Sequence, residues 1–380
     1  MNLLQKISYI IDAQKKFNSL TNVSLNDLSS GLQDQTDTSI NDEYKRSVVN
    51  RIIQSYQKAK HEQLSVLPVY RPGHKWAPQI AEKRKQYIDA LNHGDVERLL
   101  GLLNNFYRNS GVISIIKYDL YHRLTNKPLQ ANFVQKKFLY NMIKDIEIWR
   151  DQFPDHSNSE LEVPPIGNPY GYFFENTLVT AASCPAHYYV HKSHQLVSQM
   201  DHPIVCEIGG GIGQFAYFFA RKVSNLTYIG FDLPEVLVIA QFFLMNAFPD
   251  KKFLLFGEDA LIHQDKNIQE FDFILLPNFS LRELPSNSAD LFVNFHSLSE
   301  MDYATVEEYI AQIMRITKGY FYHENSEVTQ EIGYGNKEVP ANQFPIDLQL
   351  FKLVFRTKAI WREKRYWEYL YQRIKSRPPA

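Results

Sequence analysis

A run of glycines lies between residues 207 and 213, where the sequence reads Glu-Ile-Gly-Gly-Gly-Ile-Gly. An apolar stretch precedes it and an amphipathic stretch follows it, which predicts a strand, a tight turn and a helix. Glycine suits such a turn because a ligand can approach the backbone without meeting a Cβ atom. Free N–H groups at the start of the helix then face the ligand. We therefore expect Glu207, Gly209, Gly211 and Gly213 to form a binding loop.

The spacing of these glycines argues against two common classes of ligand site. A dinucleotide fingerprint requires glycine at position 214, where this chain has Gln214, and a P-loop requires Gly-Lys-Ser/Thr, which is absent. The remaining pattern, acid-x-Gly-x-Gly-x-Gly, is typical of enzymes that bind S-adenosylmethionine. A carboxylate at position 207 also suits a ligand with an ammonium group better than one with a pyrophosphate.

A second acidic residue follows the next predicted strand, residues 226–231. Asp232 precedes Leu233 and Pro234, which begin the following helix. A carboxylate at this place can accept both ribose hydroxyls of an adenosine. The glycine run and Asp232 together predict a site for S-adenosylmethionine and its product S-adenosylhomocysteine, with Leu233 beside it.

Composition and helical periodicity predict how the chain is organised. The first 150 residues show helical spacing of apolar residues, whereas residues beyond 200 alternate strand-like and helix-like runs, as βαβ units do. We expect a mostly helical N-terminal domain at 1–160 that serves substrate or oligomer contacts, a linker and helix at 161–200 that close over the site, and an α/β cofactor domain at 201–380. The last two apolar runs, 351–355 and 366–374, are expected to pair as an antiparallel hairpin.

Charge and cysteine content limit the partners and the compartment. The 41 basic and 42 acidic side chains leave a net charge of −1, which argues against a dedicated nucleic-acid binder. Two cysteines are too few for a disulfide scaffold and fit a reducing compartment. No apolar run reaches the ~20 residues of a membrane span, and the N-terminus lacks the pattern of a signal peptide. These features predict a cytoplasmic protein.

Three sets of residues resemble one protein family. The segments are Glu207 to Gly211, Asp232 to Glu235, and Asp290 to Met301 with its His-Ser-x-x-Glu-Met ending; residues 70–76 and 104–108 match more loosely. Together they resemble the bacterial sugar O-methyltransferases, over roughly residues 65–330. The resemblance implies a Rossmann-like, class I methyltransferase sheet of seven strands, mostly parallel with the last one antiparallel. It also implies an acceptor that is a sugar of a surface polysaccharide, a glycan or a nucleotide-sugar precursor.

The third strand of the predicted sheet is ambiguous. Residues 253–256 and 271–276 both qualify as strands. Asp259 after the first is an acidic candidate for the adenine contact, and Asn278 after the second is an amide candidate. The resemblance favours 271–276 and Asn278.

The acceptor hydroxyl needs a base, because it is a poor nucleophile until its proton is removed. Ligands of doubly wound sheets bind beyond the carboxyl ends of the strands. The residues that follow the fourth predicted strand there are Asn294, expected at the cofactor, with His296 and Glu300. His323 and Glu324 follow the fifth. We predict His296 as the base, with Glu300 and His323 as alternatives and Glu324 as a substrate contact.

Further substrate contacts are expected outside the sheet. Tyr172 follows a Pro- and Gly-rich stretch that could close over the cofactor, and His187, His191 and His194 share one face of a predicted helix. Histidines one turn apart can bind a metal. However, no acidic partner lies near them in sequence, so we predict no metal site. His187 and His191 are candidates for lining the substrate site, and ordinary packing is the alternative for them.

Other functions remain open at this stage. The acceptor could be another small hydroxylated metabolite, or the chain could be a catalytically silent module in glycan assembly. A nicotinamide-dependent oxidoreductase is disfavoured by Gln214. The sequence is compatible with a homo-oligomer. It does not determine which sugar is the acceptor or which hydroxyl group is methylated.

Overall fold

The chain forms two compact units. The computed structural model describes residues 11, 14–15, 18, 24–36, 40–112, 119–126, 132–258, 268–333, 336–361 and 365–374. One unit comprises the described parts of 1–41 and 101–189, and the other comprises those of 42–100 and 190–380. The expected divisions at residues 160 and 200 differ from these units, because residues 42–100 belong with the sheet.

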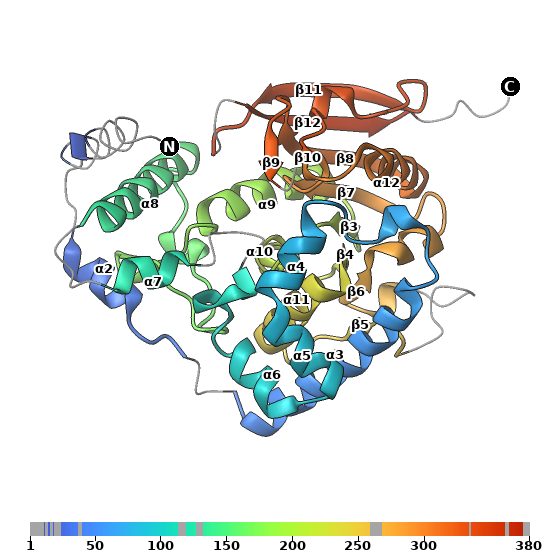
Figure 1. Ribbon diagram of the computed structural model, residues 1–380. Coiled ribbons are helices and arrows are strands. Elements are labelled where there is room, and N and C mark those ends of the chain that lie inside the picture. Colours follow the sequence, from blue (N-terminus) through green and yellow to red (C-terminus); the bar gives the residue numbers. More distant parts are fainter. Residues whose placement is uncertain are drawn as a thin grey trace, which may run out of the picture. The chain divides into compact units, whose positions relative to one another are not determined.

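The larger unit contains an eight-stranded sheet with the order β11-β12-β8-β7-β3-β4-β6-β5, which can be followed from top to bottom in Figure 1. Six adjacent strands pair in parallel, whereas β12 is antiparallel to both of its neighbours, β8 and β11. The strands are β3 (Ile204–Ile208), β4 (Thr227–Asp232), β5 (Phe253–Leu255), β6 (Phe273–Pro277), β7 (Ala289–Phe295), β8 (Thr317–Ser326), β11 (Phe351–Lys358) and β12 (Tyr366–Arg373). The α/β fold, the mostly parallel sheet and the terminal hairpin are confirmed, with one strand more than the seven expected.

The sheet has an extra strand because both candidates for the third strand, residues 253–256 and 271–276, form strands. β6 lies next to β4 in parallel register, with Tyr228 opposite Phe273, and β5 adds to the outer edge of β6. All five residues of β6 are buried, as a central strand covered on both faces requires. The preference for the second candidate as the inner strand is therefore confirmed.

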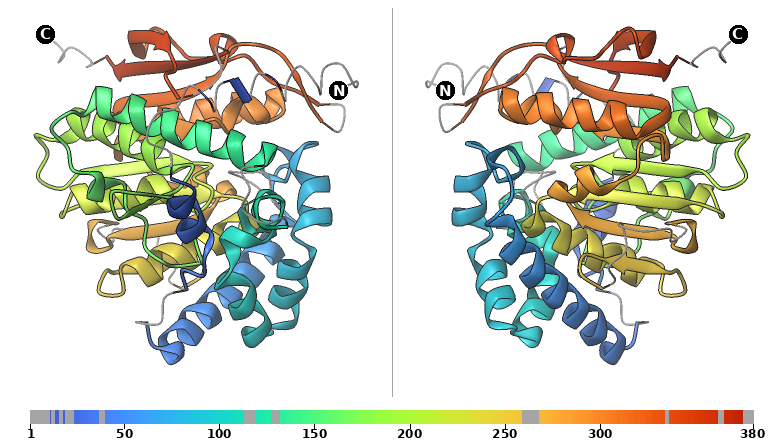
Figure 2. Two further views of the ribbon diagram at one scale, coloured as in Figure 1. Left: turned by 90° about the vertical axis from the view of Figure 1, so that its left-hand side faces the viewer. Right: turned by 90° about the vertical axis from the view of Figure 1, so that its right-hand side faces the viewer.

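Helices of the larger unit flank this sheet. They are α3 (Asp42–Gln63), α4 (Trp76–Lys83), α5 (Lys85–His93), α10 (Gln214–Lys222), α11 (Pro234–Ala247) and α12 (Tyr303–Ile316). Helix α3 packs along α11 and buries Val48, Val49 and Ile52. Figure 2 shows α3 and α5 side by side. This burial explains why an N-terminal segment belongs to the sheet unit, since the apolar side of α3 is covered only there.

The smaller unit is mainly helical. Its elements are α2 (Leu25–Leu32), α7 (Leu120–Thr125), α8 (Phe133–Gln152) and the hairpin of β1 (Tyr172–Phe174) and β2 (Thr177–Val179), with short 3₁₀ turns at Phe106–Arg108, Ser110–Val112 and Asn158–Leu161. Two helices, α6 (Val96–Leu103) and α9 (Ser183–Val197), carry the chain from one unit into the other. Outside the main sheet of the larger unit, β9 (Glu331–Gly333) and β10 (Asn336–Lys337) form a small antiparallel pair.

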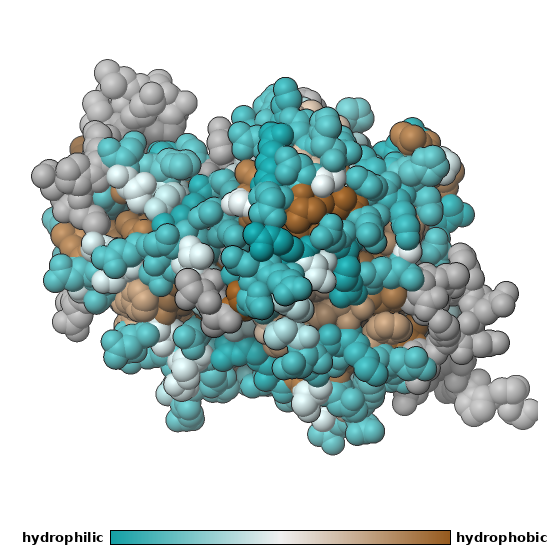
Figure 3. Space-filling view, turned by 90° about the horizontal axis from the view of Figure 1, so that it is seen from below, coloured by the Kyte–Doolittle hydropathy of each residue, from teal (hydrophilic) through white to brown (hydrophobic). Residues whose placement is uncertain are grey.

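The molecular surface is largely polar on the face shown in Figure 3, where hydrophobic patches are scattered among hydrophilic residues. Among the described helices, none combines the length and the apolar character needed to cross a membrane.

Candidate functional site

The glycine run forms the predicted turn between β3 and α10. Gly209, Gly211 and Gly213 have φ angles of 75°, 61° and 84°, in the left-handed region that favours glycine. A Cβ atom on Gly209 would lie 2.1 Å from the hydroxyl oxygen of Ser297. Both the backbone conformation and the close approach of Ser297 therefore require glycine at position 209.

Asp232 contacts this turn directly. Its carboxylate accepts a hydrogen bond from the backbone N–H of Gly211 at 3.0 Å and another from that of Leu233 at 2.8 Å. Burial raises the pKa of Asp232 to about 6, although these hydrogen bonds and the nearby Arg84 lower it. The structure thus brings together the two halves of the predicted cofactor site.

Glu207 lies beneath the turn in a buried position, 3% exposed. Tyr228 donates a hydrogen bond to its carboxylate, and a Cβ atom on Gly210 would lie 2.7 Å from the same carboxylate oxygen. Burial raises the pKa of Glu207 to about 8, partly offset by the Tyr228 hydrogen bond. Glu207 is therefore mostly protonated at neutral pH in this state.

Asn278 follows β6, at the same edge of the sheet as Asp232. Its side-chain NH₂ donates to the backbone carbonyl of Tyr70 at 2.8 Å and to the hydroxyl of Tyr309 at 2.5 Å. The amide oxygen is buried and has no hydrogen-bond partner among the described residues. The alternative adenine contact, Asp259, lies outside the described residues.

Asn294 holds three strand ends together. Its NH₂ group donates to the backbone carbonyl of Ile208 at 2.8 Å and to Ser297 Oγ at 2.5 Å. Its amide oxygen accepts from Asn325 at 2.9 Å and from the N–H of Leu298 at 3.4 Å. Through these contacts, the fully buried side chain of Asn294 holds together the C-terminal ends of β3, β7 and β8.

His296 and Glu324 form a close pair. His296 Nε2 lies 2.7 Å from Glu324 Oε1, and the backbone N–H of His296 donates to the carbonyl of Glu324 at 2.8 Å. The Glu324 side chain is 0% exposed and that of His296 is 20% exposed. A carboxylate in this position assigns the proton to Nε2, which leaves the lone pair on Nδ1. His296 also has a φ of 71°, an unusual conformation that is common at functional sites.

His323 occupies the protein interior. Its ring stacks on Tyr369 with centroids 4.9 Å apart and tilts against Phe321 at 4.8 Å. It is 0% exposed, and burial lowers its pKa to about 3. The neutral imidazole of His323 packs between the aromatic rings of the sheet and is closed off from solvent. We therefore do not propose His323 as the base.

Glu300 is paired with a cation. Lys75, which precedes α4, forms a salt bridge with its carboxylate, and both side chains are largely covered. The neighbouring His74 is exposed, and its Nδ1 lies 3.1 Å from the Asp302 carboxylate. The loosely matching segment 70–76 therefore contacts the His-Ser-x-x-Glu-Met segment, and Glu300 acts in that contact.

The predicted substrate residues outside the sheet are placed as follows. Tyr172, in the smaller unit, is 3% exposed, and its hydroxyl accepts from the backbone N–H of Ser24 at 3.3 Å. His187 and His191 lie on α9 as expected, and His191 Nε2 is 3.1 Å from the side chain of Gln195. Their contact with a substrate remains a prediction.

His187 belongs to a cluster with His156 and Glu160, whose ligand atoms lie within 4.8 Å of one another. Glu160 Oε2 lies 3.0 Å from His156 Nδ1 and 3.1 Å from His187 Nε2. Trp149 donates its indole N–H to His187 Nδ1 at 3.0 Å, so Nε2 carries the ring proton of a neutral His187. Metal-bound histidines instead donate the other ring N–H outward. The cluster is therefore better explained as a hydrogen-bond network than as a metal site.

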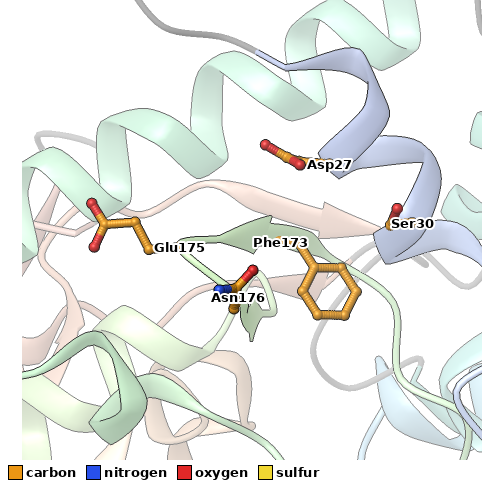
Figure 4. A pocket seen from close by; sticks show the side chains of 5 residues that line it. All are labelled: Asp27, Ser30, Phe173, Glu175 and Asn176. Carbon is orange, nitrogen blue, oxygen red and sulfur yellow. The ribbon is translucent and has the colours of Figure 1, made fainter.

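A pocket of about 360 Å³ lies in the smaller unit. Figure 4 shows Asp27 and Ser30 on α2 facing Phe173, Glu175 and Asn176 of the β1–β2 hairpin. Glu175 is already bound by Arg150 at 2.6 Å. None of the predicted catalytic or cofactor residues lines this pocket.

Several residues at the sheet edge were missed by the sequence analysis. Tyr228 and Tyr309 hydrogen-bond to the predicted cofactor residues Glu207 and Asn278, and Arg84 interacts electrostatically with Asp232. Each of the three occurs in an ordinary helix or strand pattern. Segment 70–76, which contains Lys75, was the part that the sequence did indicate, through its looser resemblance to the sugar O-methyltransferases.

Comparison with known proteins gives distant structural likenesses. No protein-family model matches the chain, and no curated protein does. Among solved structures it is similar to the mitomycin 7-O-methyltransferase MmcR (13% identity, TM-score 0.36, 51% of this chain and 56% of that one). It is also similar to magnesium protoporphyrin IX methyltransferase from Synechocystis with bound SAH (12% identity, TM-score 0.36, 62% and 96%). A third is the glycopeptide N-methyltransferase MtfA with sinefungin (10% identity, TM-score 0.33, 48% and 85%). This chain thus covers little more than half of the length of MmcR. The description of its fold depends on the strand order of this chain and not on these likenesses.

Proposed function

We propose that this chain is an S-adenosylmethionine-dependent O-methyltransferase that methylates a sugar hydroxyl, with His296 as the general base. The observation that supports this most is the short link between the glycine turn and the base. Ser297, the neighbour of His296, packs against Gly209 and also lies 3.3 Å from the carbonyl oxygen of Ile208. A methyl donor held by the turn would thus lie near His296.

The residues at this edge of the sheet fit the cofactor. The Asp232 carboxylate would accept hydrogen bonds from the ribose hydroxyls. The buried amide oxygen of Asn278 would accept one from the amino group of adenine. Glu207 would face the ammonium group, and the glycine turn lets the ligand approach the backbone. Leu233, which is half-buried beside Asp232, would contact the adenosine.

The cofactor, when bound, supplies a methyl group on a positively charged sulfur. This methyl group would pass to the acceptor oxygen, and the electron pair of the carbon–sulfur bond would remain on sulfur. His296 takes the hydroxyl proton at Nδ1 as the new bond forms. Glu324, at 2.7 Å from Nε2, fixes the ring orientation and stabilises the imidazolium that results.

A second acceptor class is favoured by the aromatic rings around the base. Tyr366 makes a T-shaped contact with His296, with ring centroids 5.3 Å apart. Rings of this kind pack against the apolar face of a sugar, and they also suit a planar phenolic metabolite. The sugar proposal rests on the motif resemblance, and the phenolic alternative rests on these rings.

Two measurements test the proposal. Calorimetric titration with S-adenosylhomocysteine should give binding, whereas titration with NAD should give none. Methyl transfer from labelled donor should be measured on nucleotide sugars and on phenols, with wild type, His296→Ala and the exposed control His93→Ala.

The expected result is donor turnover on a sugar that falls by about 10²-fold or more in His296→Ala, with unchanged affinity for the thioether. NAD binding without thioether binding would overturn the cofactor assignment. Turnover on phenols alone would replace the sugar acceptor, and thioether binding without turnover on either class would favour a silent module.

A further inference from the structure

Residues 64–75, which we call the strap, join α3 to α4. Leu64 is 75% exposed, and among the residues of the strap, all of which the structure describes, Tyr70 alone is buried. The Arg71 side chain donates to the backbone carbonyls of Leu64 at 2.7 Å and of Val66 at 3.1 Å. The strap is therefore a surface segment that is braced by its own hydrogen bonds and has one fully covered side chain.

Tyr70 covers the end of β6. Its backbone carbonyl accepts a hydrogen bond from the amide NH₂ of Asn278 at 2.8 Å, and Asn278 follows Pro277, which stands opposite Asp232 in the register of β4 and β6. Asn278 is 3% exposed, and its amide oxygen has no hydrogen-bond partner within the described part of the chain. A buried acceptor without a donor is destabilising, so this oxygen indicates a ligand that supplies the missing donor.

Side-chain contacts attach the strap to α12 and to the turn before it. The hydroxyl of Tyr70 donates to Glu308 Oε1 at 2.6 Å. Lys75 forms a salt bridge with Glu300, in the short turn that precedes α12. Single hydrogen bonds and partly exposed ion pairs each contribute little to stability, so this attachment can release and form again.

The other neighbours of Asn278 belong to the core. Its second NH₂ hydrogen bond, at 2.5 Å, goes to the hydroxyl of Tyr309 on α12, which is 2% exposed, and all five residues of β6 are buried. Displacing α12 or β6 would bring many apolar side chains into water, whereas lifting the strap would expose chiefly the ring of Tyr70. The strap is therefore the part of this cover that opens at the lowest cost.

We propose that the strap is a gate over the adenosine part of the cofactor site, which lifts to admit the ligand and closes on it. The amino group of adenine then supplies the donor that the Asn278 oxygen lacks. Lys75 and Glu300 form a latch that favours the closed state. This inference rests on the proposed function, because it places the adenine of the cofactor at Asn278.

The test is a reversible disulfide between the strap and the residue before α12. A Cβ atom on Gly73 would lie 3.5 Å from Cγ of Asp302, which is about where a cysteine sulfur would be, so Gly73→Cys/Asp302→Cys is within reach of a disulfide. The native Cys184 and Cys206 are buried, so an oxidant should act on the introduced pair. The rates of binding and release of S-adenosylhomocysteine are measured by stopped flow, oxidised and reduced. The two single-cysteine variants are the matched controls.

Oxidation before loading should slow binding of the thioether by about tenfold or more, and oxidation after loading should slow its release by a similar factor. Reductant should restore both rates, and the single-cysteine variants should show neither effect. Slow binding without slow release would indicate a damaged site, and unchanged rates would indicate a fixed strap; either result overturns the inference. Wild type that binds no thioether would instead remove the proposed function itself.

Breaking the latch is an independent test, which decides the matter if the double-cysteine variant does not fold. Lys75→Met and Glu300→Gln should each raise the rates of binding and release by about two- to fivefold, the size of a lost ion pair, and should change Kd less than either rate. Arg98→Gln, an exposed arginine of the same unit, is the control. A latch variant with wild-type rates, or one that changes the release rate alone, contradicts the gate.

Discussion

The side chains of His296 and Glu324 meet at 2.7 Å while their backbones are joined by a hydrogen bond of 2.8 Å. The pair links the ends of the neighbouring strands β7 and β8, where Phe295 stands opposite Glu324 in register. A histidine fixed twice to its partner loses little conformational entropy when it takes a proton, which suits a general base.

Replacing this carboxylate should reduce the chemical step. Glu324→Gln keeps the shape of the side chain but removes the charge that stabilises a protonated His296. We expect kcat to fall by about 10²-fold or more, with an unchanged affinity for S-adenosylhomocysteine. Steady-state kinetics across pH check this, with His93→Ala as control. A variant with wild-type kcat would show that Glu324 serves the fold alone.

Binding of the cofactor should release protons. Glu207 has a pKa of about 8 in the described state, so about nine-tenths of it is protonated at pH 7. A ligand ammonium beside it favours the ionised form and lowers that pKa. Titrations with S-adenosylhomocysteine at pH 7, in two buffers of different ionisation enthalpy, should give release of about one proton. Glu207→Gln should abolish the difference, and equal heats for wild type would contradict this role.

Glycine 209 should tolerate no side chain. Alanine there would place its Cβ atom 2.1 Å from Ser297 Oγ and would hold a φ of 75°, which costs about 1–2 kcal/mol by itself. We expect Gly209→Ala to lower the melting temperature and to abolish thioether binding. Gly101→Ala, where nothing lies within 4 Å of the added Cβ, is the matched control. Adding Ser297→Ala should restore part of the stability, and full restoration would show that backbone conformation is unimportant.

His323 should control acid stability and leave catalysis unaffected. Its pKa is lowered to about 3 from an ordinary 6.5. Between these values the unfolded chain binds a proton that the folded chain does not, so the stability from this group is complete above pH 6.5 and is lost as pH falls towards 3. His323→Phe should remove a slope of about one proton from the pH dependence of unfolding free energy. An altered lower limb in the pH–rate profile would instead indicate a catalytic role.

The sequence predicted those parts of the site that depend on local pattern. Gly209, Asp232 and His296 each follow a strand with a clear apolar run, and parallel strands bring their carboxyl ends to one edge. Arg84 and Tyr228 were missed, because their roles depend on which helix packs on which strand end. The burial of His323 was missed for the same reason, since its ring is enclosed by side chains distant in sequence, Tyr369 on β12 and Phe344.

The interleaving of the two units has a consequence for how the chain acquires its structure during synthesis. Helix α3 and Arg84 leave the ribosome long before α11, the helix that both of them contact. Until then the side of α3 that packs on α11 has no native cover, and the smaller unit is made in between. Contacts so distant in sequence slow folding, and apolar surface that can aggregate stays exposed until they form. A shortened chain that begins at residue 201 would lack these helices altogether, so we expect it to aggregate rather than to fold as a minimal catalytic piece.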